Sequence, residues 1–137
     1  ALTQTHKHLK EMTAITGLEN APIFCPIVSD FYSGMEVTVP LFKEQLCDGF
    51  TVEDIKAAYA EKFTGPLVTY IDDASEGGFM SAAGLSGKDS MQVTVVGNED
   101  RILLIARYDN LGKGASGAAV ECLNIATGNN KTLSLEL

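Results

Sequence analysis

The sequence predicts an α+β domain built on a largely antiparallel sheet. Apolar residues recur at helical spacing in two segments and alternate with polar residues in others. The two clearest strands are joined by Gly97-Asn98-Glu99-Asp100, a hairpin-like loop of four residues. The elements follow the order helix, strands, helix, strands, helix along 137 residues, a length that favours one domain with its own core.

Three helices are expected. Residues 8–16 place apolar side chains at near-helical spacing. Residues 52–63 form the clearest helix, because Thr51 can cap its start and Gly65-Pro66 ends it. Residues 115–126 form a third helix that is rich in small side chains.

The expected strands are short and are separated by Gly, Pro and polar residues. Met35, Val37 and Val39 alternate with polar neighbours, so these three side chains should share one face and be buried together. Residues 72–90 are rich in Gly, Ser and Asp and are expected to form a loop, and the final LSLEL is at most a short strand. The expected strand segments are 21–28, within which two prolines suggest an edge position, 34–42, 67–71, 92–96 and 101–108.

The charge balance argues against a phosphate-backbone partner. Ten Lys and Arg are outnumbered by eighteen Asp and Glu, the net charge is −8, and the basic residues do not cluster. Nucleic-acid binding needs a basic face, so no nucleic-acid partner is expected. No apolar run approaches the roughly 20 residues of a membrane span, so no membrane partner is expected, and the N-terminus shows no apolar signal-peptide core.

Three widely spaced cysteines, Cys25, Cys47 and Cys122, form no CxxC pair. Their odd number and spacing predict reduced thiols and a cytoplasmic protein. None stands in the electropositive setting of a nucleophile. Cys25 and Cys122 stand among apolar residues and are expected to be buried.

Residues 112–117 spell Gly-x-Gly-x-x-Gly between the apolar strand 101–108 and a helix, which is the local context of a dinucleotide-binding turn. That fingerprint also requires a parallel βαβ unit with an acidic residue about 20 residues further on. Glu136 stands near that distance, but the sheet before it is expected to be antiparallel. One alternative is a helix start whose small residues permit close packing. Another is a helix start whose free N–H groups contact an anion or an amide.

His6 and His8, the only histidines, lie two residues apart, and Glu11 follows His8 by three. On a helix, His8 and Glu11 share a face. A carboxylate that orients an imidazole suits acid–base catalysis, whereas the three side chains together suit a metal site. A solvated, charged segment is the third interpretation, and the spacing alone leaves all three open.

Two stretches together resemble the N-acetyl-gamma-glutamyl-phosphate reductase family. YDNLGKGASGAAVECLNIATG, residues 108–128, resembles a segment near the C-terminus of these enzymes. THKHLKEM followed by PIFCPIVSDFYSGMEVTVP resembles the family's segment with a His-x-His pair, a Phe-x-Pro stretch and a Gly-Met strand. Both motifs occur in the family's order and at its separation, and they span residues 5–128.

The resemblance implies a glyceraldehyde-3-phosphate dehydrogenase-like C-terminal domain, with a mainly antiparallel sheet and helices on one face. The other face or the sheet edge would be apolar and bury a second copy, giving a homo-oligomer. Residues 1–137, which begin at Ala1 rather than Met, are then expected to be the catalytic and dimerisation portion of a longer enzyme. Its dinucleotide-binding domain would lie outside this chain and pack against residues 110–128, and the Gly-rich turn would be a look-alike.

The resemblance also implies a reaction of arginine biosynthesis. A thiol attacks a small acyl phosphate, N-acetyl-gamma-glutamyl phosphate, which gives a thioester and releases phosphate. A hydride from NADPH then reduces the thioester to the semialdehyde and frees the thiol. The family's nucleophile lies in a Gly-Cys-Tyr-like context, which Cys25 in Phe-Cys-Pro does not match. On this expectation the chain alone neither reduces the acyl phosphate nor binds NADP tightly.

The family's motifs assign roles to five residues. The His-x-His pair falls on His6 and His8, with His8 as the acid–base residue and Glu11 as the carboxylate that orients it. Asn110 matches an Asn that could touch the nicotinamide amide. Ser33 stands where many members have Arg, so a contact with the substrate carboxylate would be made by its hydroxyl. The alternative function is a metal-binding or interaction module that uses His6, His8 and Glu11.

Overall fold

The computed structural model describes residues 3–137, which divide into two compact units after Asp30. The smaller unit contains helix α1, Lys7–Thr16, which confirms the first predicted helix within one residue. The expected strand 21–28 is absent from the described residues, and this segment is irregular. Pro22 and Pro26 explain the difference, because each lacks the backbone N–H that a strand ladder needs.

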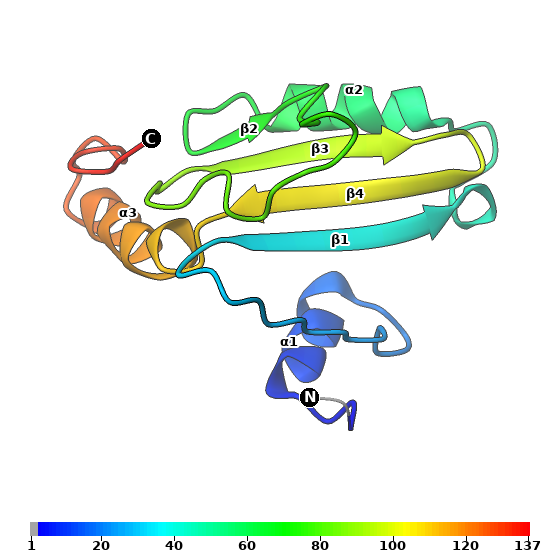
Figure 1. Ribbon diagram of the computed structural model, residues 1–137, viewed down its shortest axis with the longest axis horizontal. Helices are drawn as coiled ribbons and strands as arrows, with labels where there is room; N and C mark the ends of the chain where they lie inside the picture. Colours follow the sequence, from blue (N-terminus) through cyan, green and yellow to red (C-terminus); the bar gives the residue numbers. More distant parts are fainter. Residues whose placement is uncertain (1–2) are drawn as a thin grey trace. The chain divides into compact units, whose positions relative to one another are not determined.

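The larger unit is a four-stranded sheet with strand order β1-β4-β3-β2 (Figure 1). Strand β4 pairs antiparallel with both β1 and β3, and β2 pairs parallel with β3. The α+β class and the mainly antiparallel sheet are therefore confirmed, with one parallel pair that was not anticipated. The four strands are β1, Met35–Phe42, β2, Val68–Tyr70, β3, Met91–Gly97, and β4, Arg101–Tyr108.

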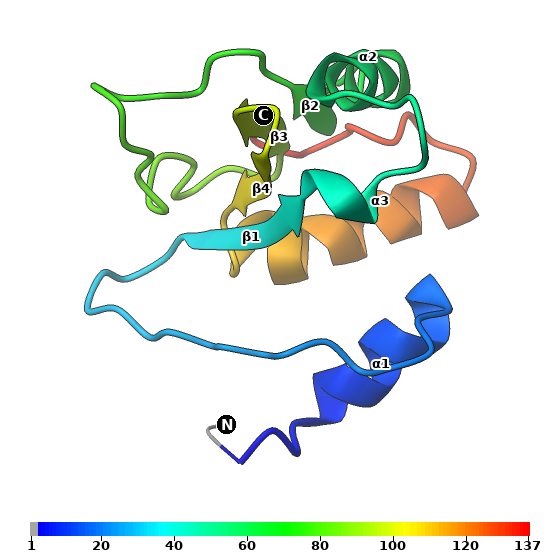
Figure 2. The same cartoon turned by 90° about the vertical axis from the view of Figure 1, so that its right-hand side faces the viewer.

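The long Gly- and Ser-rich loop has a topological cause. A hairpin cannot join parallel strands, so β2 and β3 need a crossover of a dozen or more residues. Residues 71–90 supply that crossover without a helix, and they pass over one face of the sheet (Figures 1 and 2). The segment predicted as loop thus covers part of the domain.

Helix α2, Val52–Lys62, covers the opposite face from this loop (Figure 2). Its start is fixed by a capping box, in which Thr51 N–H donates to Asp54 Oδ2 at 2.8 Å and Asp54 N–H donates to the Thr51 hydroxyl at 3.4 Å. Val52 packs with Val95 of β3 and Ile102 of β4 to form the buried core. The predicted helix 52–63 is confirmed with its cap.

The prediction for strand β1 is confirmed in register and wrong in burial. Met35, Val37 and Val39 pair with alternate residues of β4 and therefore share one face. In the chain itself they are 41%, 39% and 47% exposed. The cause is their place in the sheet, because β1 is an edge strand and α2 packs on β2 and β3.

The apolar row lies on the face that α2 covers, not on the opposite one. Val39 pairs with Leu104, Leu104 pairs with Val95, and both partners belong to the core packed by α2. The row is therefore the uncovered margin of the core face, at the sheet edge.

The chain leaves β4 through a π-helical turn, Gly112–Ser116, and enters α3, Gly117–Ala126, at the end of the sheet (Figure 1). The helix predicted over 115–126 therefore starts two residues too early, because residues 115 and 116 belong to the π-helical turn. The final LSLEL is not a strand, but it returns to the loop before β3, where Asp89 N–H donates to the Glu136 carbonyl at 2.6 Å and Glu136 N–H donates to Asp89 Oδ2 at 3.0 Å.

Candidate functional site

The two histidines and Glu11 come together at the start of α1. His6 caps this helix, because its Nδ1 accepts a 3.3 Å hydrogen bond from the His8 backbone N–H. The first helical turn then brings His8 Nε2 to 3.9 Å from Glu11 Oε2. The His8 side chain is 48% exposed, so it is open to an approaching molecule.

An aromatic contact holds the two imidazoles. The ring centroids of His6 and His8 lie 4.6 Å apart, and the Phe24 ring lies 5.1 Å from His6 and 6.1 Å from His8. The Gln4 side-chain amide fixes Phe24 by donating to its carbonyl at 2.7 Å and accepting from its N–H at 2.9 Å. The irregular segment around Phe24 is thus tied to the start of α1.

The geometry does not support the metal-binding alternative. Within residues 3–137, no group of three or more His, Cys, Asp or Glu side chains is arranged to hold a metal ion. His6 also uses Nδ1 for its cap. The arrangement instead offers one exposed imidazole beside one carboxylate, which can orient the ring.

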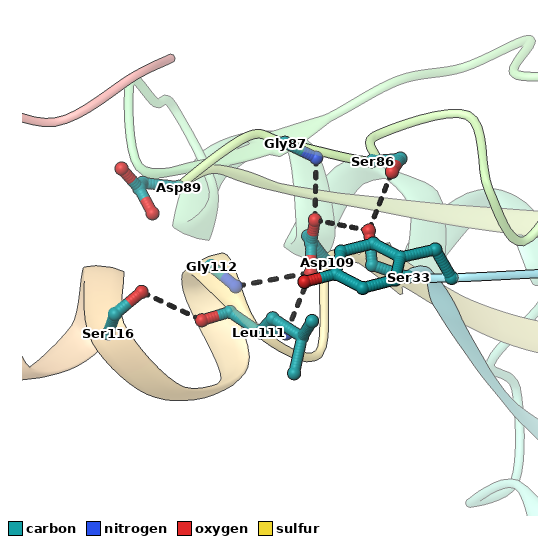
Figure 3. Close-up of a pocket in the computed structure, with 9 residues that line it drawn as sticks. Ser33, Ser86, Gly87, Asp89, Asp109, Leu111, Gly112 and Ser116 are labelled. Carbon is teal, nitrogen blue, oxygen red and sulfur yellow. Dashed lines mark hydrogen bonds between the residues drawn. The ribbon is translucent and has the colours of Figure 1, made fainter.

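In the larger unit, the Gly-rich turn is occupied by a carboxylate of the chain itself (Figure 3). Asp109 Oδ1 accepts hydrogen bonds from Leu111 N–H at 2.7 Å and Gly112 N–H at 3.1 Å. These are N–H groups at the start of the turn, which a phosphate would otherwise contact. The turn is therefore not a free phosphate cradle.

Packing explains the glycines of the turn. A side chain at Gly112 would clash with the Lys88 carbonyl, and one at Gly117 would clash with the Asp89 carboxylate. At Gly114 a Cβ would lie 3.2 Å from the Tyr108 ring. The close-packing interpretation of Gly-x-Gly-x-x-Gly is confirmed.

Ser33 and Asn110 meet where β1 begins. Asn110 Oδ1 accepts from Gly34 N–H at 2.8 Å, and the Ser33 hydroxyl donates to Asp109 Oδ2 at 2.8 Å. Ser33 is buried, and Ser86 Oγ lies 2.6 Å from its oxygen (Figure 3). In this geometry the Ser33 hydrogen is committed to Asp109, so a substrate contact through Ser33 would have to replace that bond.

Asp109 keeps its charge although it is only 2% exposed. Burial opposes ionisation, but the hydrogen bonds from Gly87, Leu111, Ser33 and Gly112 outweigh it and lower the pKa of Asp109 to about 2. With Asp109 ionised, Ser33 must donate to it and Ser86 must donate to Ser33.

Sequence reasoning did not single out Asp109 or its partner Gly87. A signal was available, since an Asp directly after a strand and before a Gly-rich turn favours side-chain bonds to the next backbone N–H groups. The bond from Gly87 comes from a distant part of the crossover loop and has no local signal.

Two further pairs of residues correct or extend the expectations. Cys25 and Cys122 are exposed rather than buried, because the segment 21–28 is not in a sheet and Cys122 lies on an outer side of α3. Lys113 and Glu121 form an ion pair between side chains that are 13% and 21% exposed, and this pair ties the π-helical turn to α3.

The chain is similar to known proteins along most of its length. Residues 1–110 match the family described as semialdehyde dehydrogenase, dimerisation domain. N-acetyl-gamma-glutamyl-phosphate reductase of Allorhizobium ampelinum is 43% identical over an alignment of 129 positions, which covers 90% of this chain and 42% of that protein. N-acetyl-gamma-glutamyl-phosphate reductase 2 of a Nostoc species is 42% identical over an alignment of 138 positions, which covers 95% of this chain and 43% of that protein.

The chain belongs to the semialdehyde dehydrogenase dimerisation domain family. The resemblance to N-acetyl-gamma-glutamyl-phosphate reductases that its two motifs indicate is confirmed by the curated relatives. The chain spans about two-fifths of the length of these relatives. None of the helices in residues 3–137 is long and apolar enough to cross a membrane.

Proposed function

We propose that the chain is the C-terminal catalytic and dimerisation portion of an N-acetyl-gamma-glutamyl-phosphate reductase. The enzyme would reduce the acyl phosphate to the semialdehyde with NADPH in arginine biosynthesis. Relatives with this name match about 90% of the chain, which supports the proposal. The three cysteines form no disulfide and suit a reducing cytoplasm.

The observation that carries the proposal is the pairing of His8 with Glu11 at the start of α1. His6 uses Nδ1 to cap the helix, whereas His8 presents an exposed ring beside a carboxylate. This difference favours His8 as the general acid–base residue, Glu11 as the group that orients it, and His6 as a structural cap. A proton held on the His8 ring can be moved to or from a substrate oxygen or thiol.

A nicotinamide cofactor would supply the hydride, and Asn110 is the residue that we propose contacts it. Asn110 uses Oδ1 to accept from Gly34, so its Nδ2 is the atom it can offer, and an amide N–H suits a carboxamide oxygen. The Gly-rich turn does not fit the cofactor's phosphates, because Asp109 occupies its donors. The phosphates are assigned to a dinucleotide-binding domain outside this chain.

Two surfaces of the larger unit suit partners. Leu123 and Ile125 of α3 are both exposed on different sides of the helix, and each offers an apolar contact point for the dinucleotide-binding domain within residues 110–128. Met35, Val37 and Val39 offer an apolar row on β1 for a second copy, so the proposed homo-oligomer forms through the sheet. Acyl phosphate is the small-molecule partner, and no nucleic acid or membrane is proposed.

The test is the turnover of His8→Asn in the reductase that contains this chain. The variant should keep its fold, because His8 is exposed and its cap bond uses the backbone N–H. Turnover should fall by about 10²–10⁴-fold, the usual effect of removing a positioned acid or base. Glu11→Gln should cost less, because it removes only the charge that orients the ring.

His6→Asn is the matched control, because Asn also caps helices well. It should keep most of the turnover. If His8→Asn keeps wild-type turnover and His6→Asn is inactive, then His6 is the general acid–base residue. Full activity in both variants would reject an acid–base role for the pair.

A further inference from the structure

The carboxylate of Asp109 joins three separate parts of the larger unit. Oδ2 accepts from the Ser33 hydroxyl, just before β1, and from Gly87 N–H, at the end of the crossover loop. Oδ1 accepts from Leu111 and Gly112 in the turn after β4. Figure 3 shows these bonds converging on the one carboxylate.

Asn110 lies between the two ends of this arrangement. In the chain Asn110 lies between Asp109 and Leu111, and the Leu111 N–H donates to the Asp109 carboxylate. The Asn110 side chain binds Gly34 N–H, the residue next to the Ser33 that Asp109 also binds. Asp109 and Asn110 therefore bind consecutive residues, Ser33 and Gly34. A shift of the Asp109 backbone would move both hydrogen bonds.

We propose that Asp109 is a positioning residue that sets the direction of the Asn110 amide. The inference rests on the proposed function, because it gives Asn110 a ligand to meet. Asp109 itself is buried, and its two carboxylate oxygens are occupied by hydrogen bonds from within the chain. It acts by holding the backbone of Asn110 and the Gly34 N–H in fixed positions, so that Asn110 Oδ1 stays occupied and Nδ2 faces outward.

A carboxylate is required at this position, and its isosteric amide is unsuitable. All four neighbours are donors, and an ionised Asp accepts from each of them. In Asp109→Asn one oxygen becomes an NH2 group that faces N–H or O–H donors. At least one pair of bonds is then lost, and the turn that carries Asn110 must move.

The experiment is a double-mutant cycle in the reductase that contains this chain. Asp109→Asn, Asn110→Ala and the double variant are assayed for NADPH oxidation with N-acetyl-gamma-glutamyl phosphate. Asp109→Asn should lower kcat/KM by about 10–100-fold, the scale of a misplaced binding group. In the Asn110→Ala background the same change should cost less than about threefold, because a residue that acts through Asn110 has nothing left to position.

Asp54→Asn is the matched control, since Asp54 also accepts backbone N–H at a helix start but lies in the capping box of α2. It should lower the melting temperature and leave kcat/KM unchanged. If Asp109→Asn does not fold, Asp109→Ser replaces it in the cycle, because its hydroxyl still accepts from the turn.

Additive losses from Asp109 and Asn110 variants in an active enzyme would overturn the inference and leave the proposed function standing. So would an unchanged kcat/KM in Asp109→Asn, as in the Asp54 control. A folded wild-type enzyme that does not reduce the acyl phosphate would overturn the proposed function and this inference together.

Discussion

Single residues decide which interpretation of an ambiguous motif is correct. The Gly-x-Gly-x-x-Gly turn has the composition of a phosphate-binding loop, yet Asp109 places its own negative charge where the phosphate would lie. Two backbone donors at the start of the turn are then satisfied within the chain. A carboxylate just before such a turn therefore argues against the binding of an external anion by the backbone N–H groups of the turn.

Acid should destabilise the larger unit through Asp109. Its hydrogen bonds lower the pKa from 3.8 to about 2 in the folded state, so the folded form favours the charged group. The stabilisation is fully present above the unfolded value and is lost as the pH falls through the folded value. The free energy of unfolding, measured with urea between pH 6 and pH 2, should fall below about pH 4.

The same titration of Asp109→Asn checks the assignment, because an amide does not titrate. Its pH dependence below about pH 4 should be shallower than that of the wild type. Equal slopes in the two proteins would assign the acid sensitivity to other carboxylates.

At the scale of elements, the sequence predicts best where the signal is local. The sequence predicts helix α2 together with its cap, because the capping residues Thr51 and Asp54 are only three residues apart. Strands β3 and β4 were found because their hairpin is short. The parallel pairing of β2, the bond from Gly87 to Asp109 and the exposure of β1 depend on residues far apart in the chain, and no local pattern encodes them.

The candidate site shows the same division. The spacing of His6, His8 and Glu11 predicts their proximity, since one helical turn brings them together. The Phe24 ring beside both imidazoles could not be predicted, because an irregular segment delivers it. In a segment such as 21–28, where prolines prevent regular structure, no periodic pattern predicts which side chains come together.

Helix α3 provides a test in which the usual helix preference should be reversed. Ala is favoured over Gly in a helix by about 1 kcal/mol, yet a Cβ at Gly117 would clash with Asp89. Gly117→Ala should therefore lower the free energy of unfolding by about 1–3 kcal/mol, the cost of an overpacked contact. Ala119→Gly, on an exposed position of the same helix, should also be destabilising, by about 1 kcal/mol.

The clash itself is tested by removing its partner. In an Asp89→Gly background, Gly117→Ala should cost less than half as much, as measured by chemical denaturation. An equal cost in both backgrounds would mean that Asp89 is not the obstacle.

At the scale of the whole molecule, the core of the larger unit remains exposed at one margin, along strand β1. α2 covers the sheet over β2 and β3, and the apolar residues of β1 continue the same face into solvent. Pro40 lies in β1 and lacks the N–H that edge-to-edge pairing needs, so stacking on the face is favoured over extension of the sheet. A second copy that packs on this row would complete the core, as the family's description as a dimerisation domain suggests.

Val37→Lys should therefore weaken self-association without unfolding the chain. Val37 is at the middle of the exposed row, and a buried ammonium there would have no partner. We expect the dimer dissociation constant, measured by analytical ultracentrifugation, to rise by about 30-fold or more, which is the cost of losing a central interface residue. Thr38→Lys adds the same charge to the opposite face of the same strand and should leave association unchanged. Dissociation by Thr38→Lys alone would place the interface on the face crossed by residues 71–90, and an unchanged constant in both variants would remove β1 from the interface.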